Sequence, residues 1–148
     1  MTQLYAARAA DASEVAAILH GRMRDTPWLP PLYSSGDTFD FAQIMIACGW
    51  VTVARAPRIE GFLALEDGFI HALYVKKPGQ GVGRALLDNA KSTAQSLSLW
   101  VFQRNDPAQR FYIREGFHEV RRTDGAGNDE KLPDILFEWN RRDENNGD

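Results

Sequence analysis

Three glycines occupy alternate positions in the stretch from Leu73 to Leu87, LYVKKPGQGVGRALL. An apolar run precedes them and a leucine-rich segment follows, which predicts a strand, a turn and the start of a helix. The first amides of a helix lack carbonyl partners, and glycines let backbone amides approach an anion closely. Lys76, Lys77 and Arg84 add positive charge. The pattern favours a phosphate-binding turn, although a tight turn without a ligand has the same signature.

Two common phosphate-binding motifs are absent from this turn. A Walker A loop needs Gly-Lys followed by Ser or Thr, whereas Gly83 is followed by Arg84. In a dinucleotide-binding G-x-G-x-x-G pattern, the last glycine would fall on Arg84 when counted from Gly79, and on Leu86 when counted from Gly81. The ligand of the turn is therefore neither a P-loop nucleotide nor a dinucleotide of the Rossmann type.

Hydrophobic periodicity predicts the elements that position this turn. Strands are expected near residues 4–8, 50–56, 60–66, 69–75, 97–102, 118–122 and 134–139, and helices near residues 11–23, 38–47, 83–95 and 105–117. Asp11 and Glu14 have the spacing of a capping box for the first helix. Asp106 is expected to cap the last helix, with Gly116 as the left-handed residue that ends it. This order predicts an α/β (α+β type) protein whose mixed sheet carries helices on both faces.

Composition narrows the classes of protein. A chain of 148 residues is long enough for one domain with a sizeable core. The formal net charge of -3 argues against a nucleic acid or an anionic membrane as partner. No stretch approaches the roughly 18 apolar residues of a membrane span, and the N-terminal residues do not resemble a secretory signal. Cys48 is the single cysteine, so we expect no intrachain disulfide and a cytoplasmic protein.

Two motifs resemble those of the GNAT superfamily of N-acetyltransferases. The glycine turn is similar to the acyl-CoA signature Arg/Gln-x-x-Gly-x-Gly/Ala: Gly81 and Gly83 match its small positions, and Pro78 stands where the family has Arg or Gln. The segment LWVFQRNDPAQRFYIREGF is similar to the family pattern N-x-x-A-x-x-F-Y-x-x-x-G-F. The matching residues are Asn105, Ala108, Phe111, Tyr112, Gly116 and Phe117. The resemblance implies a single GNAT domain over residues 1–140, with about seven mostly antiparallel strands, and a polar tail over residues 141–148.

The resemblance also implies acetyl-CoA as cosubstrate. In the family, the pantetheine arm pairs with strand backbone before the turn, and the turn holds the pyrophosphate. The residues that it assigns to acetyl-CoA are Leu73, Tyr74, Val75, Gly79, Gln80, Gly81, Val82, Gly83, Arg84 and Asn105. Ordinary core packing is the alternative for the strand side chains. No metal is expected, because His20, His71 and His118 lack metal-ligand spacing.

Catalysis by direct acetyl transfer in a ternary complex needs an acid and a base. The resemblance assigns the acid to Tyr112, whose phenol is protonated at neutral pH and can protonate the departing CoA thiolate. Glu66 is the residue that we expect to take the proton of the acceptor amine, with His71 as the other candidate. A carboxyl buried on the central strands would suit a base near neutral pH. The alternatives are that Tyr112 is only a core aromatic, that Glu66 is only a turn residue before Asp67, and that His71 is only a core histidine.

The resemblance implies an amine-bearing acceptor, which we expect to be either a small molecule or a peptide N-terminus. The loop with Trp28, Leu29 and Tyr33 would form an aromatic lid over it or cap the core. The acidic loop over residues 123–134 would attract a cationic amine or only face solvent. GNAT domains often form dimers, which leaves a homodimer open. A non-catalytic acyl-CoA-binding module with the same fold is the rival function.

Overall fold

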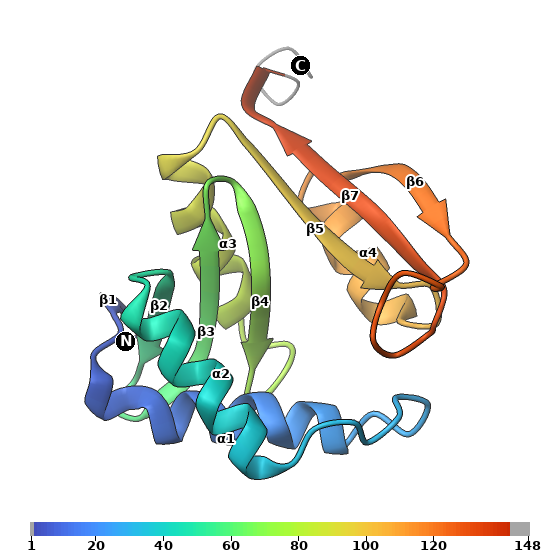
Figure 1. The fold of residues 1–148 in the computed structure, drawn as a ribbon. Coiled ribbons are helices and arrows are strands. Elements are labelled where there is room, and N and C mark those ends of the chain that lie inside the picture. Colours follow the sequence, from blue (N-terminus) through green and yellow to red (C-terminus); the bar gives the residue numbers. More distant parts are fainter. Residues whose placement is uncertain (1, 143–148) are drawn as a thin grey trace. The chain divides into compact units, whose positions relative to one another are not determined.

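The computed structural model describes residues 2–142 and confirms the predicted order of elements (Figure 1). Residues 143–148 of the expected polar tail lie outside the described residues. A short 3₁₀ turn, Ala9–Asp11, precedes the first helix. The helices are α1 Ala12–Arg24, α2 Ser35–Ala47, α3 Val82–Thr93 and α4 Asp106–Arg114. The strands are β1 Gln3–Ala6, β2 Val51–Arg55, β3 Ile59–Glu66, β4 Phe69–Val75, β5 Ser96–Phe102, β6 His118–Thr123 and β7 Asp134–Asn140.

The described residues form a seven-stranded sheet in the order β1-β2-β3-β4-β5-β7-β6. β4 pairs with β5 in parallel, with Phe69 opposite Ser98. The pairs β1–β2, β2–β3, β5–β7 and β6–β7 are antiparallel. The predicted mixed, mostly antiparallel sheet is therefore confirmed.

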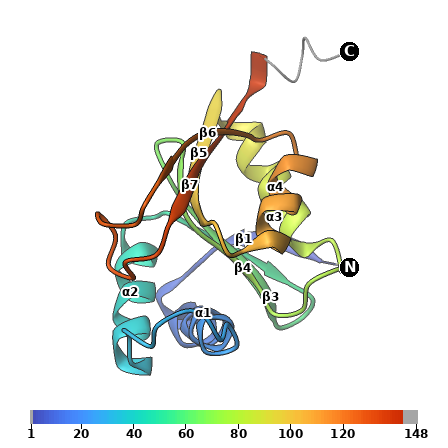
Figure 2. The same cartoon turned by 90° about the vertical axis from the view of Figure 1, so that its right-hand side faces the viewer.

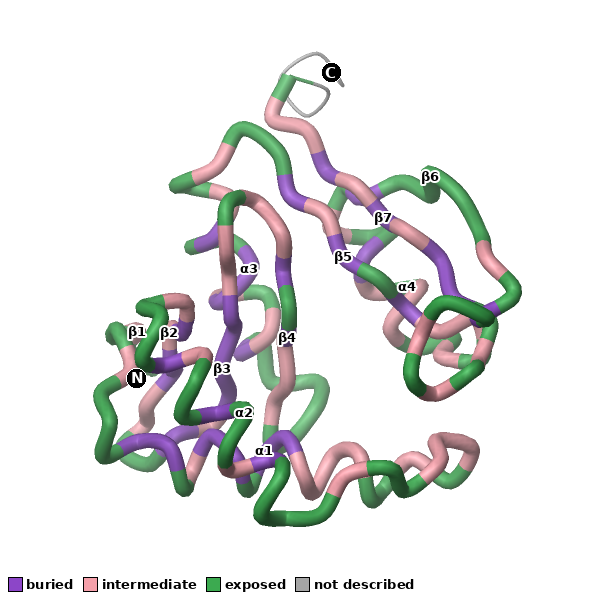
Figure 3. Tube along the Cα trace, in the orientation of Figure 1, coloured by how far each residue is buried: buried purple, intermediate pink, exposed green. Residues whose placement is uncertain are grey.

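The chain divides into two compact units. We call residues 2–66 and 71–90 the N-terminal unit, and residues 67–70 and 91–142 the C-terminal unit. In the N-terminal unit, α1 and α2 pack on one face of the strands, and Figure 3 shows buried stretches along α1 and β3. The core there includes Val15, Ala42, Val53 and Phe62. Within this unit, α3 covers the opposite face (Figure 2). Gly61 lies beneath it, because a Cβ there would come within 3.0 Å of the Val82 side chain.

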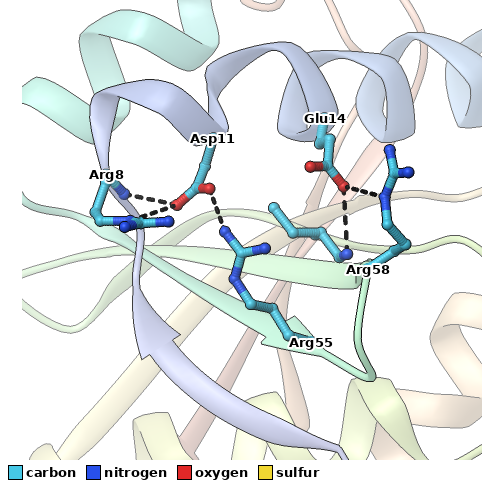
Figure 4. Close-up of polar contacts among 6 residues, drawn as sticks. Arg8, Asp11, Glu14, Arg55 and Arg58 are labelled. Atoms are coloured by element: carbon cyan, nitrogen blue, oxygen red, sulfur yellow. Dashed lines mark hydrogen bonds and ion pairs between the residues drawn. The ribbon is translucent and has the colours of Figure 1, made fainter.

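The start of α1 differs from the predicted capping box. Asp11 is 3% exposed, and its side chain makes no cap hydrogen bond to α1. Its carboxylate instead accepts a hydrogen bond of 2.8 Å from the Arg8 amide and another from the Arg55 guanidinium (Figure 4). Glu14 accepts a hydrogen bond of 3.3 Å from the Ile59 amide. The two acids therefore tie the helix to β2 and β3, which the local spacing did not reveal.

The buried Asp11 predicts a stability that depends on pH. Burial by itself raises the pKa of Asp11, but the hydrogen bonds from Arg8 and Arg55 outweigh it and hold that pKa below its usual value. This stabilisation is complete above the unfolded pKa of about 3.9 and is lost as the pH falls through the lower folded pKa. We expect Asp11→Asn to reduce the free energy of unfolding at pH 7 by about 1.5–3 kcal/mol. Urea unfolding at pH 7 and at pH 3 measures it.

The difference between Asp11→Asn and the wild type should shrink as the pH falls from about 4 toward the lower folded pKa, because Asp11 is then protonated first in the unfolded chain and finally in the folded one. Glu14→Gln is the matched control, since its ion pair with Arg58 is on the surface and worth less than about 1 kcal/mol. An equal loss in both variants would show that burial of Asp11 has no special weight.

The C-terminal unit packs α4 beside β5, β6 and β7 around the buried side chains Leu97, Leu99, Val101, Ile135, Phe137 and Trp139. Asn105, not the predicted Asp106, caps α4, because its side-chain oxygen accepts from the Ala108 amide at 3.2 Å. At the other end, the predicted Gly116 has φ 96°. Its amide donates to the Ile113 carbonyl at 3.1 Å, and the Phe117 amide donates to the Tyr112 carbonyl at 2.9 Å. This Schellman geometry ends the helix at Arg114, two residues after Tyr112.

No helix among residues 2–142 is long and apolar enough to cross a membrane.

Candidate active site

The glycine turn presents open backbone between β4 and α3. Gly79 and Gly81 have φ values of 87° and 78°, which side-chain-bearing residues rarely adopt. A Cβ built on either glycine meets no atom within 4 Å. Residues 76–81 are exposed, so the space in front of the turn is unobstructed.

Hydrogen bonds anchor both ends of this turn in the N-terminal unit. The Lys76 amide donates to the Glu60 carbonyl at 2.8 Å, which holds the end of β4 to β3. The Ala85 amide donates to the Gly81 carbonyl at 3.0 Å and closes the first turn of α3. The amides that open α3 therefore begin directly at the exposed glycines, as an anion site requires.

The side chains expected to bind acetyl-CoA divide into packed and exposed groups. Val82 is buried, and the Tyr74 ring packs 6.0 Å from the Phe62 ring. Gln80 and Arg84 are exposed, and Arg84 lies 3.9 Å from Asp88. The strand residues therefore use their side chains for packing, so a ligand contact by them would have to come from the backbone.

The two candidate bases contact each other. His71 Nε2 lies 2.8 Å from Glu66 Oε1, and the Trp50 ring stacks on the His71 ring with centroids 4.6 Å apart and planes 5° apart. Sequence reasoning treated Glu66 and His71 as alternatives and missed Trp50. The missing signal lies in how the segment that begins at Trp50 pairs with the strand that ends at Glu66: the Leu65 amide donates to the Trp50 carbonyl at 2.9 Å.

The expected burial of Glu66 is wrong. The Glu66 side chain is 44% exposed and that of His71 is 32% exposed. Glu66 is the last residue of β3, so its side chain projects where the strand gives way to a turn. The carboxylate is oriented by its imidazole partner and remains accessible to water.

Tyr112 lies in the C-terminal unit, on the buried side of α4. Its residue surface is 8% exposed, and its ring makes edge-on contacts with Phe111 and Phe117 at centroid distances of 5.1 and 5.3 Å. Asn105, in the same unit, uses its side-chain oxygen in the helix cap. Its amide nitrogen is then the part of the side chain suited to a ligand contact.

The segments expected around the acceptor differ in character. In the N-terminal unit, the Tyr33 ring packs edge-on against Phe41 at 5.3 Å. In the C-terminal unit, Asp134 is buried and accepts hydrogen bonds from the Thr123 hydroxyl and from Asn128 Nδ2, the latter at 3.1 Å. The Asp134 carboxylate therefore stabilises the loop through these hydrogen bonds. Because it is buried, it is unsuited to attract a cationic acceptor.

No group of three or more His, Cys, Asp or Glu side chains in the described part of the chain is arranged to hold a metal ion.

Comparisons with known proteins bear on the family of this chain. Residues 41–119 match the family model described as acetyltransferase (GNAT) domain. The chain is 32% identical over 142 residues to the peptidyl-lysine N-acetyltransferase YiaC of Escherichia coli, which covers 89% of this chain and 94% of that protein. It is 34% identical over 77 residues to the peptidyl-lysine N-acetyltransferase YjaB of the same organism, across 51% of this chain and 52% of YjaB.

Solved structures show the same fold. The solution structure of apo YjaB from Escherichia coli superposes with a TM-score of 0.79 at 24% identity, over 94% of this chain and 97% of that one. The acetyl-CoA complex of yncA from Salmonella typhimurium gives 0.72 at 16% identity, over 95% and 94% of the two chains. With its family model, its relatives and its fold in agreement, this chain is an acyltransferase that belongs to the GNAT acetyltransferase family.

Proposed function

We propose that the protein transfers the acetyl group of acetyl-CoA to the side-chain amine of a lysine in a polypeptide, by direct attack in a ternary complex. The exposed turn at Gly79 and Gly81, opening α3, is the observation that carries the proposal. The complex of yncA with acetyl-CoA supports the donor. The names of YiaC and YjaB, both peptidyl-lysine N-acetyltransferases, support the acceptor.

Acetyl-CoA would be held by backbone groups on either side of the turn. Amides from Gly79 to Arg84 would bind the pyrophosphate, and the exposed Arg84 and Lys76 side chains would add positive charge. The backbone from Leu73 to Val75 would pair with the pantetheine arm, since the side chains there are part-buried. The amide nitrogen of Asn105 would donate a hydrogen bond to the same arm.

Proton transfer would be divided between two groups. The acceptor amine must lose a proton before or during attack, and Glu66 would take it directly or through one water molecule. His71 would orient the carboxylate, and Trp50 would orient the imidazole through their stacked rings. As the carbon–sulfur bond of the thioester breaks, Tyr112 would donate its phenolic proton to the thiolate.

Glu66→Gln should lower kcat/KM about tenfold. This is below the 10²–10⁴ of a fully positioned base, because the part-exposed site also lets water accept the proton. The pH–rate profiles of Glu66→Gln and His71→Ala, with a lysine peptide as acceptor, test the pair. Glu60→Gln is the matched control, because it removes a carboxylate from the same strand away from His71. Profiles identical to the wild type in both Glu66→Gln and His71→Ala would remove the pair from the mechanism.

The proposed function predicts that acetyl-CoA stabilises the fold. A ligand at about 100 times its dissociation constant adds roughly 2.7 kcal/mol to the free energy of unfolding. In a chain of this size the unfolding midpoint would rise by roughly 5–10 °C. Thermal unfolding with and without acetyl-CoA, with CoA for comparison, measures the shift.

Two outcomes would contradict the proposal in different ways. A shift without acetylation of any lysine peptide would favour the rival reading of a non-catalytic acyl-CoA-binding module. No shift with any acyl-CoA would show that the glycine turn does not hold the cosubstrate.

A further inference from the structure

The outer face of α2 is apolar although it faces solvent. Phe41 and Ile44 are 44% and 57% exposed, and Cys48 at the helix end is also exposed. These positions follow each other at intervals of three and four residues, so they form one stripe along the helix. Asp37 and Asp40 continue the same stripe toward the helix start, and both are exposed. We call these five residues the α2 outer face.

The core does not account for this stripe. The opposite side of α2 already supplies the buried Thr38, Ala42 and Ile46. The Tyr33 ring extends the stripe by its edge-on contact with Phe41 at 82° between planes. Exposed aromatic and aliphatic side chains in one continuous stripe mark a surface that another molecule covers.

The charge of this region is one-sided. Residues 25–54 contain Asp25, Asp37 and Asp40 but neither lysine nor arginine. The combined charge of these three acids equals the formal net charge of -3 of the whole chain. The remaining acidic residues are therefore balanced by the lysines and arginines outside this region. Among the described residues, Asp25 pairs with Arg24 at 3.9 Å, and no ion pair involves Asp37 or Asp40.

The α2 outer face leads directly to the proposed base. Cys48 is the C-cap of α2, and the Trp50 amide donates to the Met45 carbonyl at 3.1 Å. The Trp50 ring in turn stacks on His71, all within the N-terminal unit. Figure 1 shows how the end of α2 passes into β2. A chain bound along the stripe would therefore have one end near the residues that would receive the proton of its lysine.

We propose that the α2 outer face binds a basic segment of the acceptor polypeptide. This inference rests on the proposed function and adds the surface that selects the acceptor. Asp37 and Asp40 attract the charged groups of lysine and arginine side chains in the bound segment. The aliphatic stems of these lysines and arginines cover Phe41 and Ile44. The rings of Tyr33 and Phe41 add cation–π attraction. The same carboxylates disfavour nucleic acids and acidic segments.

Cys48 allows this contact to be measured without turnover. It is the single cysteine of the chain and lies at the end of the stripe. An environment-sensitive fluorophore on Cys48 is titrated with a lysine-rich 12-residue peptide and with an acidic peptide of the same length. We expect saturable binding of the basic peptide that weakens as salt rises, and none of the acidic peptide.

Two variants test which residues carry the contact. Asp40→Lys should weaken binding of the basic peptide about 3- to 10-fold, because one exposed attraction becomes a repulsion. Ile44→Lys should weaken it similarly without touching the core, since Ile44 is exposed. Glu130→Lys is the matched control: it makes the same change of charge in the loop between β6 and β7 and should bind the peptide normally.

Kinetics separate this inference from the proposed function. With the basic peptide as acceptor, Asp40→Lys should raise KM and leave kcat unchanged, whereas the side-chain amine of free lysine should react equally with both proteins. If neither acceptor is acetylated, the proposed function is wrong. The titration of the basic peptide would still decide whether the α2 outer face binds it.

Three results would overturn the inference. The first is no binding of the basic peptide, and the second is a loss of binding in Glu130→Lys equal to that in Asp40→Lys. The third is a fluorophore signal that changes with the concentration of the protein and not with that of the peptide. If sedimentation then also shows dimers that Ile44→Lys abolishes, the α2 outer face is a contact between two copies of this chain.

Discussion

Tyr112→Phe is expected to lower kcat by about 10²-fold or more while the affinity for acetyl-CoA stays unchanged. The substitution removes only the phenolic hydroxyl. The ring that packs against Phe111 and Phe117 is retained, so α4 and its end at Gly116 should keep their structure. Steady-state kinetics with a lysine peptide, together with acetyl-CoA titration by calorimetry, measure the two parts of the prediction.

Tyr5→Phe is the control for loss of a tyrosine hydroxyl. Tyr5 lies on β1, is exposed, and donates its hydroxyl hydrogen bond to Gln3. Loss of the Tyr5 hydroxyl should not change turnover. Full activity of Tyr112→Phe would remove the phenol from the chemistry and leave Tyr112 as a packing residue of α4.

Gly81→Ala is expected to weaken acetyl-CoA binding about 10- to 150-fold. A Cβ at Gly81 projects into the open space in front of the turn, where the pyrophosphate would sit. It would displace at least one amide–phosphate hydrogen bond, which is worth about 1.5–3 kcal/mol when the acceptor is charged. The positive φ also strains alanine by roughly 1–2 kcal/mol in the folded chain itself.

Gly49→Ala separates the loss of binding from backbone strain. Gly49 has the same φ of 78° as Gly81, and a Cβ there also meets no atom within 4 Å. Both variants should therefore lose similar stability in thermal unfolding, and only Gly81→Ala should lose affinity in calorimetry. Equal affinity of the two variants would contradict a pyrophosphate site at the turn.

The elements were predictable because their signals are local. The end of α4 is an example: Gly116 supplies the left-handed residue, and Phe117 follows it into the core. The start of α4 shows the limit, because Asn105 and Asp106 are both good N-cap residues and adjacent. The sequence rule selected Asp106, whereas the hydrogen bond to Ala108 comes from Asn105.

The contacts around Glu66 depended on tertiary structure. Its bond to His71 needs the register of the turn that joins β3 and β4, and the stacking of Trp50 needs β2 beside β3. The same holds for Asp11, whose partner Arg55 lies 44 residues away and outweighs the local capping rule. The role of Tyr112 came from resemblance, that of Glu66 from the chemistry of a carboxyl on a central strand, and that of the glycine turn from both. All three remain predictions for the experiments above.

The division of the chain has a consequence for fragments of the gene. Residues 67–70 belong to the C-terminal unit but are encoded within the N-terminal one. There the Gly68 carbonyl accepts the Ser98 amide at 2.8 Å, and Phe69 pairs with Ser98. A cut after Ala90 would leave these four residues on the N-terminal fragment, separated from the unit to which they belong. Neither half expressed alone is then a complete unit, so a split reporter made at this point should regain structure only when both halves are present together.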